Sequence, residues 1–92
     1  MKIRAIINVN GRVQGVGFRR YTREKASELK ITGWVRNLTD GSVAGCFEGQ
    51  QESVETLVAL CRTGPERAVV STVSVDWLPA RNEFYEFQVV TC

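Results

Sequence analysis

The stretch from Asn8 to Thr22, NVNGRVQGVGFRRYT, combines three glycines with two adjacent arginines. Glycines let a backbone approach an anion closely and turn several N–H groups toward it. Arg19 follows the last glycine closely, and a guanidinium can hold two phosphoryl oxygens with its planar fork of N–H groups. Glycines alone would favour a turn required only for its shape. Glycines beside Arg19 favour an oxyanion site.

This segment differs from the common nucleotide-binding loops and has no obvious metal chemistry nearby. It lacks the G-x-x-x-x-G-K-[ST] spacing, and no G-x-G-x-x-G occurs in the chain. The sequence contains no histidine, the commonest general base and metal ligand. Its cysteines are scattered, which predicts neither a disulfide framework nor a zinc site; they are Cys46, Cys61 and Cys92. We therefore expect no metal and no cofactor.

A rival site begins at Cys61, because CRTGPER has the C-x5-R spacing of cysteine-dependent phosphatases. That chemistry needs a thiolate of low pKa in a loop that opens a helix. Here Cys61 falls at the end of a predicted helix, on its apolar side, where the helix dipole raises the pKa of a thiol. Glu66 would also repel phosphate. Cys61 is better interpreted as a small core residue.

The second informative stretch is GWVRNLTDGSVAGCFEG, Gly33 to Gly49. Asn37 closes a predicted strand just before a turn, and its amide could hold a water by donating and accepting hydrogen bonds. Asparagine in this position is more often only a turn residue. Asp40 is interpreted as turn chemistry and Trp34 as packing.

The elements around these residues follow from periodicity. Strands are predicted where apolar residues alternate, around 3–9, 31–38, 42–48, 69–77 and 85–89. Helices are predicted from Arg19 to Lys30 and from about Val54 to the Gly64-Pro65 stop. The order is strand, helix, strand, strand, helix, strand, with a short trailing strand. Two short helices cannot cover both faces of a sheet. We therefore expect an α+β, ferredoxin-like two-layer sandwich with a mainly antiparallel sheet and both helices on one face.

Size and charge bound the remaining possibilities. Ninety-two residues predict one domain over 1–92, with 43% hydrophobic residues and a net charge of +2. The charge is uneven: residues 1–36 carry +7 and residues 37–92 carry −5. This asymmetry fits an anion site or two halves that pair in the fold. No apolar run approaches the roughly 20 residues of a membrane span, and no signal peptide is evident, so we expect a cytoplasmic protein.

Two segments together carry a resemblance to a known family. The first is Val9 to Arg19, VNGRVQGVGFR, and the second is GWVRN, Gly33 to Asn37, followed by Gly41, Val43 and Gly49. Both are similar to the signatures of the acylphosphatases, in order and spacing, and the resemblance covers essentially the whole chain. It implies a small free-standing hydrolase of carboxyl-phosphate anhydrides.

The resemblance also implies roles for individual residues. The catalytic arginine of the family falls on Arg19 and its water-positioning asparagine on Asn37. Its phosphate cradle falls on the backbone of Gly15, Val16, Gly17, Phe18 and Arg19. Arg20 lies outside the signature, and its role is left open between a solvated side chain and a contribution to the local field. The implied ligands are a small acyl phosphate and inorganic phosphate, as product and competitor, with no nucleic acid, no membrane and a monomeric enzyme.

Two other classes remain as alternatives. RNA-recognition domains share the element order, but they need stacking aromatics on their central strands. The strand around 42–48 offers one aromatic and no basic lead. The other alternative is a regulatory or accessory domain, since acylphosphatase-like modules also begin larger carbamoyl-handling proteins. The end of the chain at Cys92 favours a free-standing enzyme.

Overall fold

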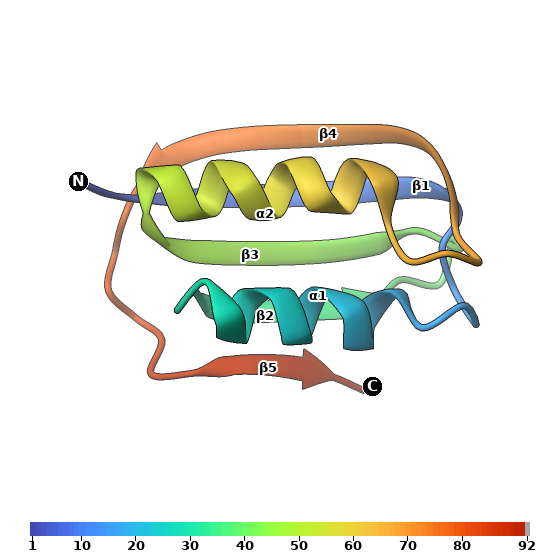
Figure 1. The fold of residues 1–92 in the computed structure, drawn as a ribbon, viewed down its shortest axis with the longest axis horizontal. Helices are drawn as coiled ribbons and strands as arrows, with labels where there is room; N and C mark the ends of the chain where they lie inside the picture. The colour runs from blue at the N-terminus through green and yellow to red at the C-terminus, as the bar shows by residue number, and fades with distance from the viewer. Residues whose placement is uncertain (92) are drawn as a thin grey trace.

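The computed structural model describes residues 1–91, and Cys92 lies outside the described residues. The expected order of elements is confirmed (Figure 1). The elements are β1 (Lys2–Arg12), α1 (Phe18–Glu28), β2 (Thr32–Asn37), β3 (Val43–Gln50), α2 (Gln51–Thr63), β4 (Val69–Pro79) and β5 (Phe87–Val90).

The strands form one five-stranded sheet in the order β4-β1-β3-β2-β5. β1 pairs antiparallel with both β3 and β4, and β2 pairs antiparallel with β3. The trailing strand β5 adds to the edge at β2, to which it is parallel. The sheet is therefore mainly antiparallel, and the fold is ferredoxin-like, as expected.

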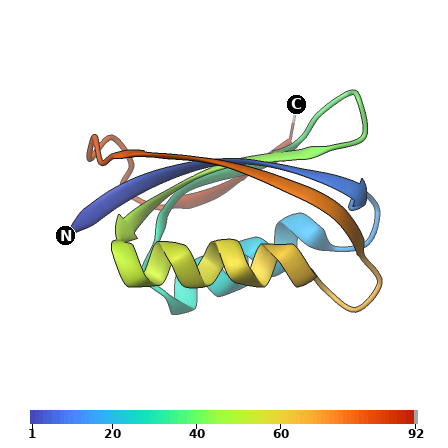
Figure 2. The ribbon, with the colours of Figure 1, turned by 90° about the horizontal axis from the view of Figure 1, so that it is seen from above.

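Both helices cover the same face of the sheet, as Figure 2 shows. The core lies between the two layers, because each helix turns its apolar stripe toward the alternating apolar residues of the strands. The buried helical residues are Phe18, Thr22 and Ala26 on α1, and Val54, Leu57, Val58 and Cys61 on α2.

One glycine of the opening stretch is not in the loop. Gly11 lies within β1, where it is opposite Val70 of β4. The strand continues past Val9 to Arg12 and stays paired with β4, with a β-bulge that shifts the register between Asn10 and Gly11. The loop that precedes α1 is therefore shorter than the glycine pattern suggests, and Gly15 and Gly17 are its glycines.

Other boundaries differ from the sequence-based expectation by a few residues. α1 ends at Glu28, and Lys30 adopts a left-handed conformation with a φ of 58°. β4 runs on to Pro79, beyond the predicted end of that strand at residue 77. Tyr85 is fully exposed and precedes β5. Periodicity predicts such ends poorly because the last residues of an element are held by tertiary contacts.

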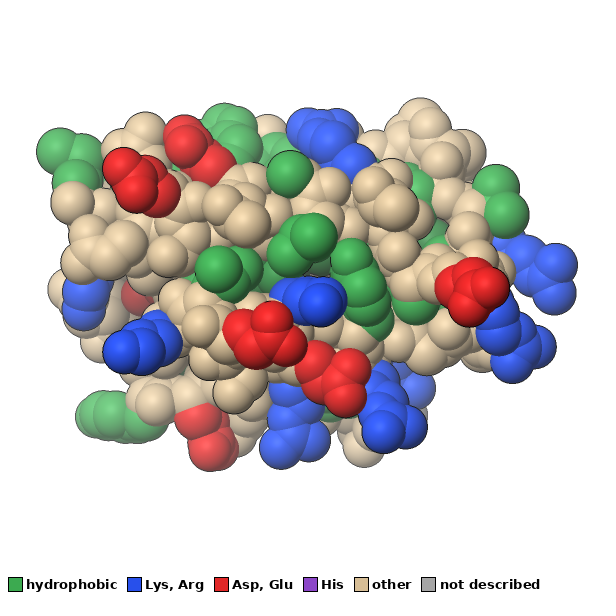
Figure 3. Space-filling view, viewed as in Figure 1, with side chains coloured by type: hydrophobic (Ala, Val, Ile, Leu, Met, Phe, Trp, Pro, Cys, Tyr) green, Lys and Arg blue, Asp and Glu red, His purple; other side chains and the backbone are tan. Residues whose placement is uncertain are grey.

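The helix-covered face carries charge of both signs. In Figure 3, Lys and Arg side chains gather over α1 and at the end of the molecule where the glycine loop lies, with acidic side chains between them.

Among the described residues, no helix is both long and apolar enough to cross a membrane.

Candidate active site

The loop between β1 and α1 is shaped by two glycines. Gly15 has a φ of 73° and Gly17 a φ of 81°, both in the left-handed region that side chains with a Cβ rarely adopt. A Cβ on either residue would meet no atom within 4 Å, so the glycines are required by the backbone conformation rather than by crowding. Successive left-handed and right-handed residues of this kind turn N–H groups to one side.

The loop leads directly into the N-terminus of α1. Gly17 is the N-cap, and its carbonyl accepts the first helical bond from the Tyr21 amide at 3.0 Å. A glycine has no side chain to accept the free N–H groups of the first turn, and that turn contains no acidic residue. These amides and the positive end of the helix dipole therefore remain available to an anion.

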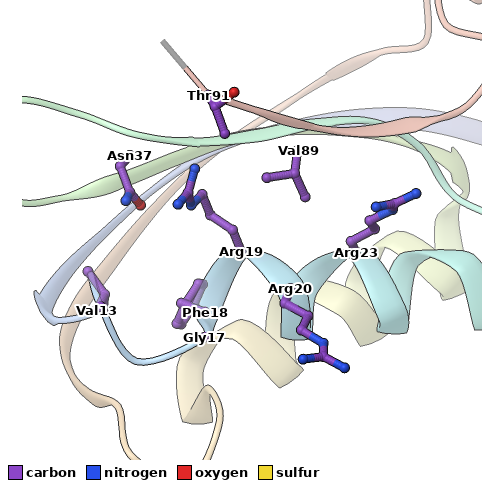
Figure 4. A pocket seen from close by; sticks show the side chains of 10 residues that line it. Val13, Gly17, Phe18, Arg19, Arg20, Arg23, Asn37, Val89 and Thr91 are labelled. Atoms are coloured by element: carbon purple, nitrogen blue, oxygen red, sulfur yellow. The ribbon is translucent and has the colours of Figure 1, made fainter.

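A pocket of about 330 Å³ opens beside this helix end. It brings together Arg19, from the first turn of α1, and Asn37, the last residue of β2. Figure 4 shows the side chain of Arg19 directed toward Asn37. The residues that line the pocket are Val13, Gly15, Gly17, Phe18, Arg19, Arg20, Arg23, Asn37, Val89 and Thr91.

The guanidinium of Arg19 is partly buried and is tied to the edge strand. Its Nη1 donates a long hydrogen bond of 3.4 Å to the carbonyl of Val90 in β5. This contact uses one of the five N–H donors of the guanidinium, which leaves a pair available for bidentate binding of an anion. The trailing strand thus helps to orient the arginine.

Asn37 has a side-chain oxygen that the protein does not use. Among the described residues, two buried side-chain polar atoms lack a hydrogen-bond partner: Oδ1 of Asn37 and Nε of the adjacent Arg36. A buried carbonyl oxygen without a partner is unfavourable unless a ligand or water donates to it. Asn37 lines the pocket, and its Oδ1 is thus an acceptor at the pocket that has no partner within the described protein.

The predicted site residues are largely brought together. Gly15, Gly17, Phe18, Arg19 and Asn37 line one pocket. The side chain of Val16 is buried in the core, so only its backbone can face a ligand.

Arg20 lines the same pocket but points away from Asn37 in Figure 4. Its side chain is 84% exposed, and its Nε lies 3.6 Å from a carboxylate oxygen of Glu24. This placement favours the solvated interpretation that the sequence left open.

Four lining residues were not predicted: Val13, Arg23, Val89 and Thr91. Arg23 could have been found, because it follows Arg19 by one helical turn on α1. Val89 and Thr91 gave no signal, since only the parallel pairing of β5 with β2 brings them to the loop.

The pocket is electropositive. Three of its lining residues are arginines, and no lining residue among those described is acidic. The charge asymmetry of the sequence therefore reflects, in part, arginines gathered at one pocket. The described residues contain no group of three or more His, Cys, Asp or Glu side chains placed to hold a metal ion.

The rival thiol is buried away from solvent. Cys61 has no exposed surface, and burial raises the pKa of its thiol to about 12, against a weak contact with the Thr22 hydroxyl at 3.9 Å. Burial also raises the pKa of the Cys46 thiol. A neutral, inaccessible sulfur cannot act as the nucleophile of a phosphatase.

The one aromatic residue of the strand that an RNA-recognition domain would use is not available to a base. Phe47 of β3 has no exposed surface and packs in the core beneath the helices, 5.8 Å between ring centroids from Phe87. A buried ring cannot stack on a base.

Comparisons with known proteins agree with the resemblance of the sequence and with the fold. The family model described as Acylphosphatase matches residues 5–89. An acylphosphatase of Geotalea uraniireducens is 51% identical over 89 residues, which cover 97% of this chain and 98% of that protein.

Solved structures give the same result. The acylphosphatase from Bacillus subtilis superposes with a TM-score of 0.93 at 32% identity, covering 97% of this chain and 99% of that one. An acylphosphatase from Coxiella burnetii gives a TM-score of 0.91 at 36% identity, covering 97% and 93%. On its sequence and its fold, this chain belongs to the acylphosphatase family.

Proposed function

We propose that the protein hydrolyses acyl phosphates by direct attack of water on phosphorus, within a pocket built by the loop of residues 15–19, Arg19 and Asn37. Water forms the new P–O bond while the bond between phosphorus and the carboxyl oxygen breaks. The electron pair leaves with the carboxylate, and the protons of the water remain on inorganic phosphate. No covalent enzyme intermediate is required.

The observation that carries this proposal is the meeting of three groups in one pocket. The loop amides and the start of α1 supply N–H donors, Arg19 supplies a planar fork, and Asn37 supplies an unused buried oxygen. The first two would hold the phosphoryl oxygens as charge shifts among them in the transition state. This is electrostatic stabilisation together with positioning, which is most of what phosphoryl transfer requires.

Asn37 is assigned to the water. Its Oδ1 would accept one hydrogen of the water, which directs a lone pair of the water oxygen away from Oδ1. For hydrolysis, that lone pair must point at phosphorus on the side opposite the leaving group. The buried, unpartnered state of Oδ1 supports this role, because a strand-end asparagine needed only for its turn would have no reason to keep an unsatisfied oxygen in a pocket.

The absence of histidine from the sequence suits this substrate class. A phosphate ester of an alcohol expels a strong base and usually needs a proton donor or a metal ion. An acyl phosphate expels a carboxylate, whose conjugate acid has a pKa of about 4, so it leaves without help at neutral pH. We therefore propose that the reaction needs no metal and that inorganic phosphate competes with substrate for the cradle.

The remaining assignments are also proposals. We propose that the enzyme acts as a monomer in the cytoplasm, without nucleic acid or membrane. The two described cysteines are free and buried, which fits a reducing compartment.

One assay tests the proposed function. Purified protein is given benzoyl phosphate or acetyl phosphate, with and without a chelator, and with increasing inorganic phosphate. We expect turnover of both substrates, unchanged by the chelator and inhibited competitively by phosphate, with no turnover of an alkyl phosphate monoester. Loss of activity in the chelator, or absence of turnover in folded protein, would contradict the proposal.

A further inference from the structure

One side chain joins the two halves of the pocket. Gln14 directly precedes the first cradle residue, and its Nε2 donates a hydrogen bond of 2.8 Å to the carbonyl of Leu38 and one of 2.9 Å to the carbonyl of Ser42. Leu38 in turn directly follows Asn37. Gln14 and Leu38 are thus each one residue along the chain from a group that the proposed reaction uses.

The two carbonyls that Gln14 contacts also close the hairpin between β2 and β3. The amide of Leu38 donates to the Ser42 carbonyl at 2.8 Å, and the amide of Gly41 donates to the Leu38 carbonyl at 3.2 Å. Each carbonyl oxygen has two lone pairs, so the hydrogen bonds from Gln14 occupy the second one on each. The turn is closed by its own backbone, and Gln14 adds a link from the turn to the loop.

Side chains of the turn itself and of β1 also hold the turn. Asp40 accepts hydrogen bonds from the Ser42 amide at 2.9 Å and from the Ser42 hydroxyl at 2.6 Å. Asn8 of β1 donates to the same hydroxyl at 3.1 Å. These contacts shape the turn without touching the loop of residues 15–19. Among the side-chain hydrogen bonds of the described residues, those of Gln14 are the ones that join this turn to that loop.

We propose that Gln14 is a positioning residue for hydrolysis: its amide fixes the distance between the phosphate cradle and the water held by Asn37. This inference rests on the proposed function, because it gives Gln14 a role only through those two groups. In-line attack tolerates little misplacement, and a shift of about 1 Å can cost about 100-fold in rate. Removing the link should therefore slow the chemical step while the cradle, formed by its own glycines and by α1, still binds phosphate.

The experiment is a double-mutant cycle with Asn37. Gln14→Met keeps the length of the side chain and removes both donors. Gln14→Glu keeps its shape and faces the two carbonyls with acceptors. We expect kcat for benzoyl phosphate to fall at least about tenfold in both, since misplacing the water by part of an ångström has this effect. The inhibition constant of phosphate should stay within about twofold in Gln14→Met, whereas in Gln14→Glu the added negative charge should raise it. In an Asn37→Ala background, where no positioned water remains to be misplaced, Gln14→Met should change kcat by less than about twofold.

Asn8→Ala is the matched control, because it removes a hydrogen bond to the same turn but no contact with the loop. Its kcat should stay near that of the unmodified protein. Circular dichroism and melting verify that each variant is folded, and if Gln14→Met melts below the assay temperature, Gln14→Glu takes its place in the cycle.

Several results would overturn the inference. These are an unchanged kcat in Gln14→Glu, a loss in the Asn37→Ala background as large as in the parent, or a rise in the phosphate inhibition constant of Gln14→Met that matches its fall in kcat. If Asn37→Ala itself kept a normal kcat, the water-positioning role in the proposed function would fail, and this inference with it. If Asn37→Ala is slow but the effects of the two variants simply multiply, only the role of Gln14 fails.

Discussion

Arg19 and Asn37 line the same pocket, although one opens a helix and the other closes a strand far along the chain. The antiparallel pairing of β3 with both β1 and β2 brings the end of β2 beside the loop that follows β1. The sheet therefore places the proposed water-holding group next to the proposed phosphate-holding group.

Arg19→Lys should lower kcat/KM for benzoyl phosphate by about 100-fold or more, because an ammonium cannot reproduce the bidentate hydrogen bonds of a guanidinium. Steady-state kinetics measure the loss. Arg20→Lys is the matched control, because Arg20 is next to Arg19 in the chain but its side chain is exposed and paired with Glu24. The kcat/KM of Arg20→Lys should therefore stay within about threefold of that of the unmodified protein. Near-normal kinetics for Arg19→Lys would remove Arg19 from the mechanism.

Asn37→Ala should lower kcat by about 100-fold, the usual effect of removing one preorganised hydrogen-bonding group. Because the loop and Arg19 are untouched, phosphate should still inhibit with a similar constant. Kinetics with phosphate as inhibitor separate the two effects. If phosphate binding were lost instead, Asn37 would belong to the cradle rather than to the water.

Gly17→Ala should weaken phosphate binding, because a Cβ disfavours the φ of 81° and the loop would relax away from its present shape. The strain is about 1–2 kcal/mol, since the Cβ itself meets no neighbour. Gly41→Ala is matched in strain, with a φ of 94° and open space around it, but it lies outside the cradle. Melting should show similar losses of stability for both, and calorimetric titration with phosphate should show weaker binding for Gly17→Ala alone.

Cys61→Ala should leave kcat within about twofold and reduce the free energy of unfolding by about 1 kcal/mol, the cost of removing a small buried group. The buried thiol, with a pKa of about 12, should also react slowly with an alkylating reagent at pH 7 in the folded protein. Kinetics and urea unfolding measure the two effects. A folded variant without activity would restore the cysteine-phosphatase interpretation.

Glu48→Gln should destabilise the protein more at neutral pH than in acid. The Glu48 carboxylate is 4% exposed and accepts hydrogen bonds from Arg4 Nε and the Arg81 amide, both at 2.7 Å, and from the Asn82 amide at 3.0 Å. Burial acts to raise the pKa of Glu48, but these donors outweigh it, so its pKa lies below the ordinary value of 4.5.

A carboxyl whose pKa is lowered by folding contributes its full stability above the unfolded pKa and loses it as the pH falls through the folded pKa. The difference in unfolding free energy between the two proteins should be about 2 kcal/mol at pH 7, the range for hydrogen bonds to a charged group. It should shrink below about pH 4.5. Urea unfolding across this range tests the prediction, and a difference that grew in acid would show that the pKa of Glu48 is raised instead.

The elements, the layers and the position of Arg19 beside a glycine loop at the start of a helix were predictable from the sequence because they depend on local rules. Alternation and helical periodicity specify strands and helices, and a glycine loop with an arginine beside it at the start of a helix favours an anion site. The order of elements and the small number of helices then limited the architecture to one sheet with one covered face.

Other features depended on contacts between residues distant in the sequence, which local patterns do not encode. The shift of Gly11 into β1 follows from pairing with Val70 of β4. The position of Val89 at the side of the pocket follows from the parallel pairing of β5 with β2. The contact of Gln14 with Leu38 and Ser42 follows from the hairpin lying against the loop. The sequence alone determined which groups are present for the proposed binding and hydrolysis of an acyl phosphate, because residue types and local periodicity are encoded along the chain. Only the packing of sheet, loop and hairpin decided how those groups face one another, because that depends on contacts between distant residues.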